Sequence, residues 1–120
     1  MLFKLKGLPS YAQHLDKLNR IQGARFGGAM VLDPQVLQQS YETCLRGELP
    51  DQVPLAFQIP TVADSSLAPE GYHIASAYGF YFPCEAEKSR RGKLRDQMAE
   101  KIIDHICLHM PDFRELISNQ

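Results

Sequence analysis

The feature that most constrains this fold is a regular spacing of apolar residues toward the C-terminal end of the chain. They recur every four residues, at Leu94, Met98, Ile102, Ile106 and Met110, with Ile103 beside them. This interval places them along one face of a helix, which we expect from about Ser89 to His109. Pro111 ends the helix, because proline cannot continue the backbone hydrogen bonding.

Two further helices are indicated by their boundary residues. Asp33 is a favourable N-cap, Pro34 suits the first helical position, and Gly47 stands where a left-handed C-cap is expected. One face of this helix is lined by Val36, Leu37, Ser40, Tyr41, Cys44 and Leu45. Asp112 and Glu115 have the spacing of a capping box and predict a short final helix. Its apolar residues are Phe113, Leu116 and Ile117.

Two strands are expected in the first quarter of the chain. Phe3 and Leu5 alternate with lysines, as in a strand with one buried face. Residues 26–32 form the second candidate, and the Gly27-Gly28 pair suggests a bulge or a close backbone approach there. Residues 11–23, between these strands, fit either a short helix or a loop.

Two more strands are expected in the middle of the chain. Leu55, Phe57 and Ile59 lie at period two, and Pro60 implies that this third strand lies at a sheet edge or carries a bulge. Residues 72–82 are apolar or small on both faces, which predicts a central strand covered on both sides. A short reversal joins the two strands, so we expect them to be antiparallel. The order of elements predicts an α+β fold: one domain, residues 1–120, with a mostly antiparallel sheet of about four strands and helices packed on it.

The reversal between these strands is predicted to be a structural turn. The Asp64 carboxylate can accept hydrogen bonds from the backbone that follows it. Pro69 fixes one φ angle, and Gly71 can adopt a positive φ. Leu67 is expected to anchor the loop in the core.

Charge and cysteine usage limit the partners. Thirteen Lys and Arg residues against fourteen Asp and Glu give a net charge of -1, which argues against nucleic acid as a partner. No apolar run approaches the ~20 residues of a membrane-spanning helix, so no membrane span is expected. Cys44, Cys84 and Cys107 form no CxxC pair and suit buried thiols in a reducing compartment. We therefore expect a cytoplasmic protein.

No motif establishes a catalytic or metal site. His105 and His109 lie four apart on the long helix, but no acidic residue completes an HExxH pattern. Cys84 and His73 would have to lie within hydrogen-bonding distance to form a nucleophile pair, yet a straight strand would separate them by ~35 Å. We assign no catalytic residue and no metal ligand. A basic cluster interleaved with acidic residues suits a solvated helix start or, alternatively, an anion contact. It comprises Lys88, Arg90, Arg91, Lys93 and Arg95.

The aromatic residues of the fourth strand are the most suggestive functional feature. Alternation places Tyr72, Tyr78, Phe80 and Phe82 on one face and Tyr81 on the other. These residues fit a core packed under a helix. Alternatively, one face lines an apolar substrate pocket or a partner surface, where tyrosine can keep one end in water.

Residues 54–73, PLAFQIPTVADSSLAPEGYH, resemble a stretch of the phytoene-dehydrogenase-like FAD-dependent oxidoreductases, which include the pyridine nucleotide-disulfide oxidoreductase domain proteins. The family pattern has Ile-Pro-Ser/Thr and then Asp-x-Ser/Thr-Leu-Ala-Pro-x-Gly-x-His. It is matched here by Ile59, Pro60, Thr61, Asp64, Ser66, Leu67, Ala68, Pro69, Gly71 and His73. Residues 5–9, 33–34, 46–47, 91–95 and 111–117 also fit, so the resemblance spans most of the chain.

The resemblance implies an internal piece of a longer enzyme. The family holds FAD with an N-terminal Rossmann fingerprint and a C-terminal glycine-rich segment, and neither occurs here. The chain would then be a substrate-binding domain without an FAD-binding domain, catalytically silent alone, because the cofactor carries the hydride chemistry. The alternative is a free-standing module for small-molecule binding or assembly. An independent enzyme using Cys84 or the histidines is disfavoured. Exposed apolar surface predicts a homodimer, and an apolar small molecule is the expected ligand.

Overall fold

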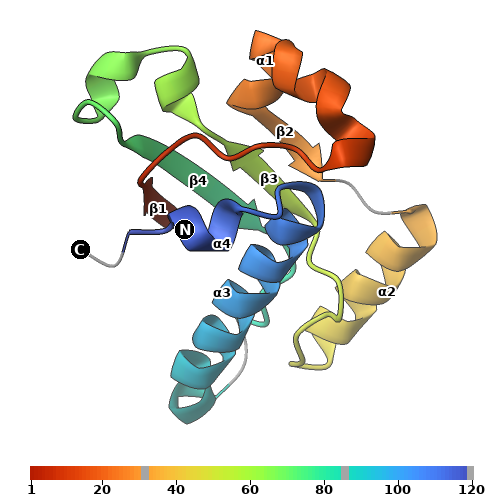
Figure 1. Ribbon diagram of the computed structural model, residues 1–120. Coiled ribbons are helices and arrows are strands. Elements are labelled where there is room, and N and C mark those ends of the chain that lie inside the picture. The colour runs from red at the N-terminus through yellow and green to blue at the C-terminus, as the bar shows by residue number, and fades with distance from the viewer. Residues whose placement is uncertain (31–32, 85–86, 119–120) are drawn as a thin grey trace.

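A computed structural model describes residues 1–30, 33–84 and 87–118. Four strands form one antiparallel sheet in the order β1-β4-β3-β2 (Figure 1). They are β1 (Leu2–Leu5), β2 (Gly27–Met30), β3 (Leu55–Gln58) and β4 (His73–Gly79). The α-helices are α1 (Gln22–Phe26), α2 (Pro34–Leu45), α3 (Lys88–His109) and α4 (Phe113–Leu116). Helices pack on the sheet, which confirms the α+β fold.

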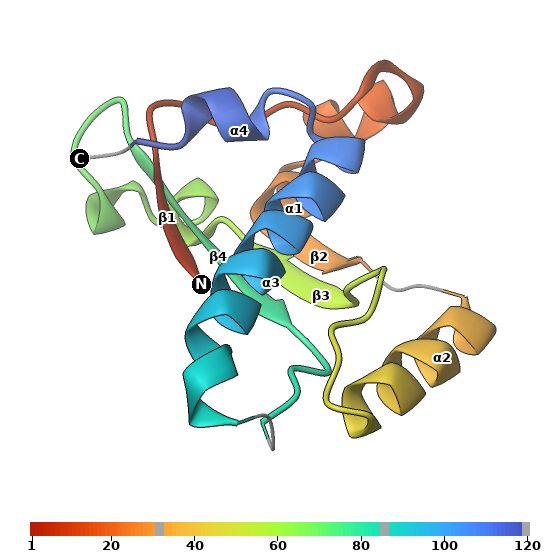
Figure 2. The ribbon, with the colours of Figure 1, turned by 90° about the horizontal axis from the view of Figure 1, so that it is seen from below.

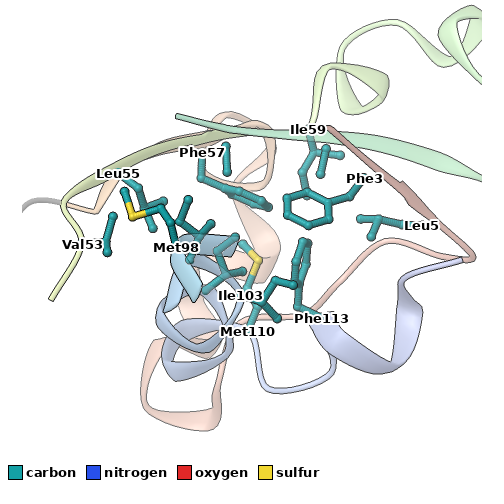
Figure 3. Close-up of a cluster of buried hydrophobic side chains, with 14 residues drawn as sticks. Phe3, Leu5, Val53, Leu55, Phe57, Ile59, Met98, Ile103, Met110 and Phe113 are labelled. Carbon is teal, nitrogen blue, oxygen red and sulfur yellow. The ribbon is translucent and has the colours of Figure 1, made fainter. Parts of the chain in front are cut away.

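The core lies between one face of the sheet and helices α3 and α4 (Figures 1 and 2). The predicted four-residue spacing is confirmed, because all of its residues are buried: Leu94, Met98, Ile102, Ile103, Ile106 and Met110. On the sheet, the alternate residues Phe3, Leu5, Leu55 and Phe57 face these helices. Phe113 stands edge-on to both Phe3 and Phe57, with ring centroids 5.2 and 5.5 Å away (Figure 3).

Helix α2 has the predicted boundaries, but most of its side chains are not buried. The Asp33 carboxylate accepts a hydrogen bond from the Gln35 backbone N–H at 2.8 Å, and Gly47 has a φ of +77°. Of the residues on its predicted apolar face, only Ser40 is buried, and its hydroxyl donates to the Gln52 carbonyl at 3.1 Å. Tyr41 and Leu45 are exposed. The helix lies beside the sheet, not on its face (Figures 1 and 2).

Residues 11–23, which fitted either a short helix or a loop, are largely helical. A 3-10 helix, η1 (Gln13–Arg20), leads directly into α1. Phe26 ends α1 and does not begin the next strand, so β2 starts at Gly27, and the predicted strand residues 31–32 lie outside the described part of the chain. The predicted close approach at the glycine pair is confirmed, since Gly27 lies against the backbone of β3.

Strand β3 is an interior strand, so the expected sheet edge or bulge at Pro60 is wrong. The strand ends at Gln58, and Pro60 is the first residue of a 3-10 turn, η2 (Pro60–Val62). Pro60 therefore removes no hydrogen bond from the sheet.

Strand β4 is central, as predicted, but it is covered on one side only. Ala75 and Ala77 are fully buried beneath α3, whereas the side chain of Tyr78 on the other face is 64% exposed. The strand ends at Gly79, and Tyr81 has a φ of +65°, which turns the chain away from the sheet. The expectation of two covered faces and a strand to residue 82 is therefore wrong.

The C-terminal segment closes the outer edge of β1. Ile117 forms an antiparallel bridge with Leu5, and the Ser118 N–H donates to the Lys4 carbonyl at 2.8 Å. Helix α4 forms, but the predicted capping box does not. The Asp112 carboxylate instead accepts a hydrogen bond from the backbone N–H of Ser10, with N–O distances of 3.1 and 3.2 Å to its two oxygens. Within the described ranges no helix has both the length and the apolarity to cross a membrane.

Candidate functional site

A groove opens where β4 runs past the start of β1. Leu2 pairs with Ser76, and the backbones of Met1 and Ala77 exchange hydrogen bonds of 2.7 and 2.9 Å. Beyond this point β1 offers no partner to the last residues of β4. A groove of about 380 Å³ lies there, between the end of β4 and α3.

The walls of this groove are mainly apolar. Its lining residues are Met1, Ala77, Tyr78, Gly79, Phe82, Arg95, Asp96, Met98, Ala99 and Ile102. Its two charged side chains, Arg95 and Asp96, are largely exposed and lie 3.8 Å apart from guanidinium Nε to carboxylate Oδ1. Such a lining can hold an apolar molecule through burial of its surface.

Gly79 lets α3 approach the sheet at this groove. A Cβ on residue 79 would lie 2.8 Å from both Ile102 Cδ1 and Met98 Cε. Glycine therefore brings the helix closer than any side-chain-bearing residue could without displacement of these two side chains.

The structure brings together two of the four predicted pocket residues. Tyr78 and Phe82 line the groove. Tyr72 lies at the other end of β4, where the Lys4 ammonium stands 4.5 Å from its ring centroid. Phe80 is half exposed and is not a lining residue. The predicted single face is therefore split, because the chain leaves the sheet after Gly79.

The Tyr81 side chain contacts α2. The Tyr81 and Tyr41 rings meet edge-to-face, with centroids 5.8 Å apart. One turn further along α2, burial raises the pKa of the Cys44 thiol, and the nearby Cys84 thiol raises it further. Cys84 itself is exposed, so the expectation that all three thiols are buried is wrong.

The turn from Asp64 to Gly71 has the predicted construction. Asp64 Oδ1 accepts hydrogen bonds from the Ser66 hydroxyl at 2.6 Å and the Ser66 N–H at 3.0 Å, and these bonds lower the pKa of the carboxyl group. Gly71 has a φ of +79°, and the Tyr72 N–H donates to the Pro69 carbonyl at 3.0 Å. Leu67, however, is 48% exposed and does not anchor the loop in the core.

His73 has a different neighbour from the one that a nucleophile pair requires. Its Nδ1 lies 2.9 Å from the hydroxyl of Thr61, which is buried. Burial lowers the pKa of His73, and the positive charge of Arg25 lowers it further. Sequence reasoning did not select Thr61 or Arg25 as functional residues, because only the fold brings them to His73.

His105 and His109 lie side by side, with ring centroids 5.7 Å apart. His105 Nδ1 lies 2.7 Å from the Val53 carbonyl oxygen, and burial lowers the pKa of His109, with smaller contributions from His105 and His14. Among the residues that the structure describes, no three His, Cys, Asp or Glu side chains are placed to hold a metal ion.

The basic cluster of α3 borders a second, more open hollow beside residues 48–51. Arg90, Lys93 and Lys101 line it together with acidic residues of both segments, including Asp51, which lies 3.8 Å from the Lys101 ammonium. The mixture of signs gives no concentrated positive field, as expected for a solvated helix start.

Comparisons with models of known protein families and with solved structures found no match for this chain. The resemblance of residues 54–73 therefore stays a prediction.

Proposed function

We propose that the groove between β4 and α3 binds an apolar small molecule. We further propose that the chain is a substrate-binding domain similar to that of phytoene-dehydrogenase-like FAD-dependent oxidoreductases, catalytically silent alone. The observation that carries the proposal is the apolar lining of the groove, which includes Phe82, Met98 and Ile102.

Size and chemistry of the groove support this ligand class. Its volume, about 380 Å³, lies within the range of small-molecule sites. Met98 and Ile102 supply flexible and branched apolar contacts from α3, and the aromatic ring of Phe82 is a further lining residue. The ligand would therefore be largely hydrocarbon, with few polar atoms.

The chemistry of the groove lining supports a binding role. Among its members only Arg95 and Asp96 have charged side chains, and both are exposed, so the lining offers no activated nucleophile or buried acid. In the proposed parent enzyme, FAD supplies the hydride chemistry from another domain, and this chain supplies one wall of the substrate site.

The alternative is a free-standing small-molecule-binding or assembly module that reuses the same domain. The groove serves this role equally well. A flavin absorption spectrum in the purified chain would contradict both versions, since each assigns FAD to other segments.

The proposed assembly is a homodimer in the cytoplasm. Large apolar side chains are exposed on two surfaces: Tyr41 and Leu45 on α2, and Leu2 and Tyr78 on the sheet face opposite the core. Sedimentation at micromolar concentration tests the assembly. A single 13.6 kDa species would contradict it.

The groove is tested by binding of Nile red, an uncharged fluorescent probe, to the full chain. Ala99→Leu places a larger side chain in the lining, where it fills part of the groove. The probe can then bury less of its apolar surface, so binding should weaken at least about fivefold. Leu108→Ala is the control, since Leu108 is an exposed α3 residue outside the groove. Equal weakening by both substitutions, or by neither, would contradict the proposed site.

A further inference from the structure

The groove between β4 and α3 has an apolar end and a charged end. From α3 it is lined by Arg95, Met98, Ala99 and Ile102, with Asp96 beside them. The first four residues have the spacing i, i+3, i+4 and i+7, which places them along one face of the helix. We call these four residues the α3 stripe. Met98 and Ile102 are buried, whereas the side chain of Arg95 is 81% exposed. The α3 stripe therefore leads from hydrocarbon in the core to a guanidinium at the surface.

The Arg95 guanidinium has donors left for a ligand. Its one ion pair among the described residues is to Asp96, and the 3.8 Å from Nε to Oδ1 exceeds the length of a hydrogen bond. Both side chains are largely exposed, and water screens such a pair, so Asp96 holds the guanidinium only weakly. A ligand's carboxylate can offer two oxygens to the planar N–H groups, which is a stronger arrangement. The charged end of the groove therefore suits a carboxylate.

The place of Asp96 on the helix favours an anionic ligand over a cationic one. Asp96 is turned by about 100° around the helix axis from Arg95, so it lies beside the α3 stripe and not on it. Asp96 also borders the second hollow, whereas Arg95 lines the groove only. A guanidinium is weakly hydrated for a charged group, which lets it lie against apolar surface. Arg95 is therefore the group that determines the charge of the ligand.

We propose that the groove binds a fatty acid, with its alkyl chain along Met98, Ala99 and Ile102 and its carboxylate on Arg95. This inference rests on the apolar ligand proposed above for the same groove. The α3 stripe spans about 10 Å along the helix axis, so an extended alkyl chain can lie on it while the head group stays at the exposed end. Burial of the chain supplies most of the binding free energy, and Arg95 selects the head group.

Competition with Nile red on the full chain tests this inference. The competitors are decanoate, decanol and decylammonium at neutral pH, which share one alkyl chain and differ in the charge of the head group. We expect decanoate to displace Nile red with saturation. Added sodium chloride should weaken decanoate relative to decanol, because salt screens an exposed pair of charges.

Three substitutions separate the head group from the alkyl chain. Arg95→Gln keeps hydrogen-bonding capacity but removes the charge, so it should weaken decanoate at least about threefold and leave decanol unchanged. Lys93→Gln is the matched control, since Lys93 is an exposed base of the same helix that borders the second hollow and not the groove. It removes the same charge and should leave decanoate binding unchanged. Ala99→Leu should weaken decanol and decanoate alike, because it fills the apolar part of the groove.

Three results would overturn the fatty acid and leave the apolar ligand standing. One is decanoate that binds to Arg95→Gln as tightly as to the wild type, with decanol still competing. Another is an equal loss of decanoate binding in Lys93→Gln. The third is decylammonium that binds more tightly than decanoate and is weakened by Asp96→Asn, which would assign the opposite charge to the ligand. If neither decanol nor decanoate displaces Nile red, the apolar ligand itself is contradicted, and the fatty acid with it.

Discussion

Gly27 of β2 lies so close to Phe57 of β3 that a Cβ on residue 27 would stand 2.1 Å from the Phe57 carbonyl oxygen. The φ of Gly27 is +133°, a conformation that other residues resist. Because a methyl group would meet backbone and not a flexible side chain, Gly27→Ala should lower the free energy of unfolding by about 3 kcal/mol. Urea unfolding measures the change.

The neighbouring glycine provides the control. A Cβ on Gly28 would have no atom within 4 Å, so Gly28→Ala should change stability by less than about 0.5 kcal/mol. Equal effects of the two substitutions would show that the close approach of β2 to β3 is not what requires glycine.

The aromatic cluster around Phe113 makes the C-terminal segment part of the core. Phe113 is fully buried and contacts Phe3 and Phe57 edge-on. Phe113→Ala should therefore destabilise the fold by about 3–5 kcal/mol, through lost burial and the cavity that remains. Leu108→Ala, at a side chain that is 70% exposed, should have an effect below about 0.5 kcal/mol. A small loss at Phe113 would mean that the core closes without α4.

The turn before β4 allows a test that separates backbone strain from side-chain chemistry. Gly71→Ala should destabilise the protein by about 1 kcal/mol, because its φ of +79° is unfavourable for alanine although there is space for the methyl group. Asp64→Asn should melt close to the wild type, since the amide oxygen can still accept from Ser66. Asp64→Ala, which removes the acceptor, should melt at a lower temperature than Asp64→Asn. The reverse order would contradict the turn geometry.

Two histidines should make the fold sensitive to mild acid. The pKa values of His73 and His109 are both lowered from 6.5 in the folded chain, chiefly by burial. As the pH falls below 6.5, the unfolded chain takes up protons that the folded chain resists, so the free energy of unfolding decreases. Above that pH both states are neutral at these positions and stability levels off.

Equilibrium unfolding between pH 5 and pH 8 measures this slope. His109→Gln should flatten it, because glutamine does not titrate. His14 and His105, whose charges lower the pKa of His109, stay in place in that variant. An unchanged slope would assign the acid sensitivity to groups other than His109.

Local patterns were sufficient for the elements whose boundaries depend on nearby residues. The spacing from Leu94 to Met110 specified α3 and its buried face, since helix periodicity is a property of the backbone itself. Asp33 and Gly47 marked the limits of α2 for the same reason, as both act on adjacent backbone groups. A local motif failed where a distant partner competed for it. The Asp112 carboxylate bonds the Ser10 backbone and does not cap α4.

The candidate sites depended on tertiary structure to a larger extent. Alternation placed Tyr78 and Phe82 on one face, and both residues line the groove. It could not show that the strand ends at Gly79, that Tyr81 has a positive φ, or that Phe80 is not a lining residue. The sequence of residues 72–82 also could not reveal that only one face of the sheet packs against helices. The helices that bury a sheet face come from segments far away in the sequence. The contact of the Tyr41 and Tyr81 rings is of the same kind, since some forty residues of chain lie between them.

The enclosure of β1 between β4 and the C-terminal segment has a consequence for synthesis on the ribosome. Leu5 pairs with His73 on one side and with Ile117 on the other, and both partners are made after β1. At typical elongation rates β1 must wait on the order of ten seconds for its second partner. Until the C-terminal segment is made, Phe3 and Leu5 lack Phe113, the residue of α4 that packs with them in the folded core.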